Sequence, residues 1–71
     1  MRNDLYLYTT EIEQYKETIA KLEEMKSIYE GDGVYLYGGY YTEMMDVING
    51  QIEDCHKFIA NIQSYINEHF N

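Results

Sequence analysis

The 71-residue chain contains no proline, no tryptophan and a single cysteine, Cys55. One cysteine cannot form an internal disulfide, which excludes the cystine-stabilised scaffolds of small secreted proteins. No hydrophobic run approaches the roughly 18–20 residues of a membrane-spanning helix, and no charged-then-apolar leader follows Met1. We therefore expect one cytoplasmic domain over residues 1–71, without membrane contact.

Basic residues are scarce: five Lys and Arg oppose 13 Asp and Glu, for a formal charge of −8. Such a chain repels nucleic-acid phosphates and anionic lipids, so we expect no direct nucleic-acid binding. A basic protein surface would instead be attracted, and its encounter with the chain accelerated. Nine tyrosines and two phenylalanines are too many apolar rings for a disordered chain.

Two stripes of apolar residues with alternating spacings of three and four predict two long helices. The first stripe consists of Leu5, Tyr8, Ile12, Tyr15, Ile19 and Leu22. The second consists of Tyr41, Met45, Ile48, Ile52, Cys55, Ile59, Ile62 and Ile66, and Met44, Phe58 and Tyr65 widen it on one flank. We predict helices over about 4–30 and about 42–69, joined by a Gly- and Tyr-rich connection at 31–40.

The first stripe is interrupted at Lys26, where Met25 and Tyr29 are expected to continue it. Gly31-Asp32-Gly33 is predicted to end the first helix, with Gly31 in the left-handed conformation typical of helix C-termini. In the second helix, Asn49-Gly50 usually indicates a turn. The heptad phase nevertheless continues across it, so we predict an unbroken helix that glycine weakens by about 1 kcal/mol relative to alanine.

The expected fold is all-α, an antiparallel two-helix hairpin. Two rods cannot enclose both apolar stripes, so the hairpin is expected to pair as a homodimeric four-helix bundle or to bind another protein. The residues predicted to form the core and dimer seam are Ile12, Tyr15, Ile19, Leu22, Met45, Ile48, Ile52, Cys55, Ile59, Ile62 and Ile66.

An alternative interpretation places a short Tyr-rich β-hairpin at the bend. Residues 5–8 and 34–37 alternate aliphatic side chains with tyrosine, a period of two that favours strands. Gly38-Gly39 suits a two-residue hairpin turn. Thr10 can cap a first helix that begins only at Glu11. The alternative fold is a sheet of two or three strands carried on two helices.

Candidate chemistry is sparse. Glu53 and His56 have the Glu-x-x-His spacing of di-iron bundles, but the heptad phase leaves Glu53 outside the seam. Cys55 lies in the seam, where a free cysteine commonly acts as a small buried hydrophobe. No phosphate-binding loop, zinc pairing or nucleophile elbow is present. We expect no metal, no cofactor, no catalytic residue and no enzymatic activity.

Tyrosine and acidic side chains are the candidate partner-binding residues, because tyrosine is enriched at interfaces and carboxylates steer a protein toward a basic surface. The predicted set is Tyr6, Tyr8, Tyr35, Tyr37, Tyr40, Tyr41, Glu23, Glu24, Asp32, Glu43 and Asp46. They predict an inhibitor or regulator that docks on a basic surface of a larger protein, with nucleic-acid-handling proteins as one such class. Alternatively, the acidic surface serves solubility alone.

In size, acidity and lack of catalytic motifs the chain is similar to many phage-encoded inhibitors, including anti-CRISPR proteins. That resemblance implies a bacterial or phage-infected cell, and it carries over no individual residue. Tyr29-Glu30-Gly31 at the predicted bend resembles the WXG-type secreted helical hairpins, with tyrosine in place of the tryptophan. This second resemblance implies the alternative function, a structural hairpin dimer whose role is assembly.

Overall fold

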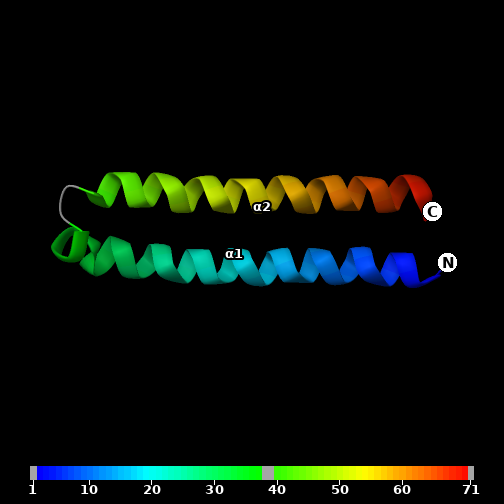
Figure 1. Cartoon of the computed structure of the whole chain (residues 1–71), viewed down its shortest axis with the longest axis horizontal. Helices are drawn as coiled ribbons and strands as arrows, with labels where there is room; N and C mark the ends of the chain where they lie inside the picture. Colours follow the sequence, from blue (N-terminus) through cyan, green and yellow to red (C-terminus); the bar gives the residue numbers. More distant parts are fainter. Residues whose placement is uncertain (1, 38–39, 71) are drawn as a thin grey trace.

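The computed structural model describes the backbone of residues 2–37 and 40–70 and the side chains of residues 4–31 and 40–70. Two helices, α1 (Arg2–Tyr37) and α2 (Tyr41–His69), account for nearly all of it. They lie side by side and antiparallel, with both chain ends at one end of the rod and the bend at the other (Figure 1). The molecule measures 51 × 15 × 11 Å. The all-α hairpin predicted from the sequence is therefore confirmed.

The core is a thin seam between the two helices. Its buried residues are Ile12, Ile19, Leu22, Ile48 and Cys55. All eleven predicted seam residues are buried or half-buried, because the spacing of three and four turns each toward the other helix. Even the most buried side chain, Ile48, keeps 3% of its surface exposed. Two rods thus cover each other along one line only.

Ring contacts fix the register of the two helices. The ring centroids of Tyr8 and Tyr65 are 5.0 Å apart, and those of Tyr15 and Phe58 are 5.4 Å apart. The two ring pairs are seven residues apart on α1 and seven residues apart on α2, so the apolar stripes of the two helices stay in phase along the rod. Extending this register places Tyr41, the first residue of α2, opposite position 32 of α1.

The predicted end of the first helix was wrong. α1 continues through Gly31 to Tyr37, and no left-handed φ occurs at Gly31. In this register a helix that ended at residue 30 would leave Tyr41 and Thr42 with no residue of α1 opposite them, which accounts for α1 as far as residue 32. Residues 34–37 are helical, and the described residues contain no strand, so the β-hairpin alternative is not supported. Gly38-Gly39, its predicted turn, lies outside the described residues.

The start of α1 also excludes a cap at Thr10. α1 begins at Arg2, and the neighbouring Thr9 hydroxyl donates to the carbonyl oxygens of Leu5 (3.1 Å) and Tyr6 (3.0 Å) within the helix. This threonine pattern is one that helix interiors tolerate. The strand-like alternation of residues 5–8 is overridden because Leu5 and Tyr8 lie on the seam side of α1.

Both helices continue through a residue that interrupts their apolar pattern or helical propensity, Lys26 in α1 and Gly50 in α2. Gly50 lies inside α2 as predicted, on the exposed side of an unbroken helix. Lys26 occupies the seam half-buried, and Tyr29 packs against the core beyond it. Met25, expected to share that role, is exposed instead, because it lies about 100° around the helix from Lys26.

In the described ranges, neither helix has the combination of length and apolar character that crossing a membrane requires.

Candidate interaction surfaces

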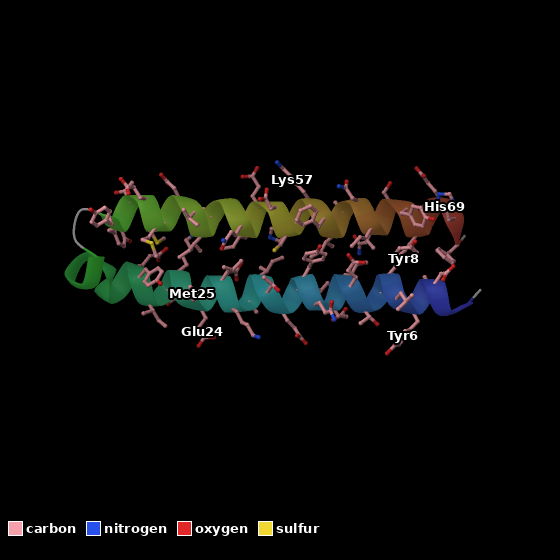
Figure 2. The ribbon with its side chains drawn as sticks, viewed as in Figure 1. Tyr6, Tyr8, Glu24, Met25, Lys57 and His69 are labelled. Atoms are coloured by element: carbon pink, nitrogen blue, oxygen red, sulfur yellow. The ribbon has the colours of Figure 1, made fainter. Side chains whose placement is uncertain are left out.

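The predicted tyrosines are divided between the two ends of the rod. Tyr6 is 69% exposed and points away from α2, whereas Tyr8 lies between the helices (Figure 2). Tyr40 is exposed and Tyr41 half-buried at the bend, at the opposite end of the 51 Å molecule. The described tyrosines therefore do not form one continuous contact surface.

Tyr8 belongs to a terminal aromatic cluster that closes the open end of the hairpin. This cluster consists of Tyr8, Tyr65, His69 and Phe70. Besides the Tyr8–Tyr65 contact, the rings of Tyr8 and Phe70 meet edge-on at 6.1 Å, and those of Tyr65 and His69 lie 4.2 Å apart. The Phe70 N–H donates to the Ile66 carbonyl oxygen at 2.8 Å, which ends α2 and holds the Phe70 backbone in place.

The same cluster perturbs the phenol of Tyr8. A hydrogen bond with Tyr65, followed by repulsion from the Tyr65 phenolate, raises the pKa of Tyr8 above its ordinary value of 10.0. The carboxylates of Asp4 and Glu11 add to the effect. Tyr8 thus contributes to closing the open end of the hairpin, with partners that lie more than 50 residues away along the chain.

Carboxylates line the side of α1 that faces away from α2, and we call Glu13, Glu17 and Glu24 the acidic edge. All three are exposed. Glu24 projects away from α2 on the same side as Tyr6 (Figure 2). Glu17 and Glu13 precede Glu24 by seven and eleven residues, about two and three helical turns, so they lie in the same row. The Lys16 ammonium lies 3.6 Å from the Glu13 carboxylate, an exposed pair of little energetic weight.

The remaining predicted acidic residues lie elsewhere. Glu23 is exposed on α1 about 100° around the helix from Glu24, while Glu43 and Asp46 are exposed on α2. Lys57 points away from α1 (Figure 2), and Asp46 precedes it by eleven residues, about three turns, so Asp46 lies on the outer side of α2. The side chains of Asp32, Tyr35 and Tyr37 lie outside the described residues. The described carboxylates therefore occupy both outer sides of the rod.

One broad side of the hairpin carries an aromatic face, formed by Tyr8, Tyr15, Val47, Phe58 and Tyr65. The two ring pairs place Tyr8 and Tyr15 on the same side of the seam as Tyr65 and Phe58. Val47 precedes Phe58 by eleven residues and so shares its side of α2. Val47 is 56% exposed and Phe58 47% exposed. Val47, Phe58 and Tyr65 thus leave apolar surface uncovered along this side of α2, with the exposed carboxylate of Asp54 between Val47 and Phe58.

The opposite broad side is polar. An open groove between the helices is lined there by Thr9, Ile12, Gln63, Ile66 and Asn67. Gln63 and Asn67 are each two residues from Tyr65, about 200° around α2. The hairpin therefore has two unlike sides, one aromatic and one polar.

The described residues offer little for catalysis or metal binding. Glu53 and His56 are both exposed, and Glu53 is 3.7 Å from Lys57 in a solvated ion pair. Within the described part of the chain no three His, Cys, Asp or Glu residues are placed to hold a metal ion. Cys55 is a free thiol buried in the seam. A second shallow hollow, on α1 alone, is lined by Leu7, Thr10, Glu11, Gln14, Tyr15 and Thr18.

Comparison of the chain with known protein families, curated proteins and solved structures found no match.

Proposed function

We propose that this chain is a non-enzymatic protein-interaction module that inhibits or regulates a larger protein by docking on a basic surface of it, inside a bacterial or phage-infected cell. The acidic edge of α1 carries the proposal. It presents three exposed carboxylates in one row, next to the exposed ring of Tyr6. A row of carboxylates can occupy a basic channel in place of nucleic-acid phosphates, which makes nucleic-acid-handling proteins one class of target.

The dimensions of the acidic edge suit a rigid docking element. Glu13 and Glu24 are eleven residues apart, or about 17 Å along the helix axis. Because all three carboxylates are already solvated, docking needs no rearrangement of the hairpin to expose them. The net charge of −8 adds long-range attraction to a basic partner and speeds the encounter at low salt.

The test compares two charge-matched variants. In the first, Glu13, Glu17 and Glu24 are replaced with glutamine. In the control, Glu30→Gln, Glu53→Gln and Glu68→Gln remove the same charge from exposed positions outside the acidic edge. Each set includes one carboxylate that pairs with a lysine within the helix. The partner is first captured from the source cell at low and high salt, then purified for affinity measurements with each variant.

We expect the first variant to bind the partner about tenfold more weakly, since three exposed charge pairs contribute about 0.5 kcal/mol each. The control variant should bind nearly as tightly as the natural chain, and the salt dependence of binding should fall only in the first. Equal weakening in both variants would mean that net charge alone matters. If both variants retained the partner at high salt, that result would contradict docking through carboxylates.

A further inference from the structure

The strongest unexplained feature is the amount of surface that the hairpin leaves exposed. The chain exposes 5516 Å², whereas a compact monomer of 8.5 kDa exposes about 4,650 Å². The excess, roughly 850 Å², is close to the ~800 Å² that each partner contributes to a standard-size protein interface. Among the exposed large hydrophobic side chains, the aromatic face contributes Val47, Phe58 and Tyr65, and the others are Tyr6, Leu7, Met25, Ile28 and Tyr40.

We propose that a second copy of this chain covers the aromatic face, so that two hairpins form a four-helix bundle. The face extends over the 19 residues from Val47 to Tyr65, about 27 Å along α2. A partner must therefore offer an apolar strip of similar length, and the same face on another hairpin does so. None of its five residues is charged, although Glu11 lines the hollow beside Tyr15, and the acidic edge of each copy remains in solvent.

Charge placement at the margins favours the second copy over an unrelated partner. Asp54 lies at the margin on α2, seven residues after Val47 and four before Phe58. On α1, three-residue steps from Tyr15 through Thr18 to Lys21 turn about 60° each, which places Lys21 at the other margin. Within the described part of the chain neither Lys21 nor Asp54 has an ion-pair partner.

A two-fold axis parallel to the helices relates the two copies and brings the α2 margin of one copy next to the α1 margin of the other. It lays α2 of the second copy over α1 in antiparallel orientation, the usual arrangement of a four-helix bundle. The register given by the Tyr15–Phe58 contact then sets Asp54 of one copy about two residues, roughly 3 Å, from Lys21 of the other along the axis. Symmetry forms this pair twice. The hollow beside Tyr15 lies level with Phe58 of the second copy and can receive its ring.

The first measurement is the solution mass over a range of concentrations, by analytical ultracentrifugation. We expect twice the monomer mass of 8.5 kDa. Val47→Glu should dissociate the dimer, because it buries a charge without a partner, whereas Ile28→Glu should leave it intact. Ile28 is a matched control, since it is 52% exposed on α1 but lies outside the aromatic face. Helicity of both variants by circular dichroism separates loss of pairing from loss of folding.

A charge exchange tests the identity of the occupant. Asp54→Lys and Lys21→Asp should each weaken the dimer about tenfold, and the double variant should restore it. Only pairing of the chain with itself gives this rescue. Asp54→Lys also lowers the net negative charge, so general repulsion would change the affinity in the opposite direction.

Three results would overturn the proposal: a monomer at about 0.1 mM, dissociation by Ile28→Glu but not by Val47→Glu, or failure of the double exchange to restore pairing. A monomeric chain in which another protein protects Val47 would assign the face to that protein instead. These measurements need no docking partner, so their failure is independent of the proposed inhibitory function.

Discussion

Replacing Gly31 with alanine should raise the free energy of unfolding, because Gly31 lies inside α1 and not after its end. The helix continues to Tyr37, and a Cβ built at Gly31 meets no atom within 4 Å. In an exposed helix interior, glycine costs about 0.8–1 kcal/mol relative to alanine. No core packing changes, so this propensity difference sets the size of the effect.

For a domain of this size, a gain of about 1 kcal/mol raises Tm by roughly 4–8 °C. The assay is thermal unfolding followed by circular dichroism, with every variant at the same protein concentration. Gly50→Ala is the matched control, because Gly50 is also exposed in a helix and has equally open space around it. Both substitutions should stabilise the hairpin to a similar extent.

The opposite sign at Gly31 would refute the reasoning. If Gly31 ended the helix in the left-handed conformation, alanine there would cost about 1 kcal/mol or more. Tm would then fall for Gly31→Ala while it rose for Gly50→Ala. That pair of results would show that α1 ends near residue 30.

Three further predictions concern the seam and the terminal aromatic cluster. Ile48→Ala should lower the free energy of unfolding in urea by about 2–4 kcal/mol, because Ile48 is the most buried side chain. Ile28→Ala on the exposed surface should change it by less than about 0.5 kcal/mol. Similar losses in the two variants would contradict the burial pattern. Lys26→Leu should raise the free energy of unfolding by about 1 kcal/mol, because a half-buried seam position then gains apolar area, and a lower urea midpoint would count against it. The raised pKa of Tyr8 means that the folded state favours the neutral phenol. The contribution of Tyr8 to stability is therefore complete below the unfolded-state pKa of about 10, and it is lost as pH rises through the folded-state pKa. Helicity measured between about pH 8 and 12 should therefore fall less steeply in Tyr8→Phe than in the natural chain, and identical curves would exclude a role for the Tyr8 hydroxyl.

The two long helices could be predicted because the hydrophobic pattern is strong wherever packing decides the structure. Ile48, Cys55 and their neighbours repeat at heptad spacing, and each turns toward the other helix. The same periodicity correctly predicted that α2 continues through Gly50, where the local sequence favours a turn. A pattern sustained over many residues outweighs a local preference of about 1 kcal/mol.

The extension of α1 beyond residue 30 was not predicted, and only its first two residues have α2 opposite them. Gly31 and the residues after it favour a turn or strand locally. The register of Tyr15 against Phe58 sets the start of α2 opposite residues 31 and 32, whereas residues 33–37 continue α1 beyond the start of α2. Tertiary packing thus overrides local propensity at residues 31 and 32, as it commonly does for short segments.

The candidate surfaces were predictable as residue types but not as arrangements. Exposed carboxylates such as Glu24 follow directly from helical spacing. The tyrosines do not, since their grouping depends on which ends of the rod they occupy. Tyr8 faces Tyr65 only because the hairpin is antiparallel, and no signal in either segment alone indicates that contact.

The terminal aromatic cluster also has a kinetic consequence. Tyr8 and Tyr65 lie 57 residues apart, at the end of the rod farthest from the bend. A hairpin that forms from its bend makes local contacts first, because the entropy cost of closing a loop rises with its length. Contacts between these rings then form after the folding transition state. Substitutions in the cluster should accelerate unfolding and leave the folding rate nearly unchanged, so the cluster controls how long the open end stays closed.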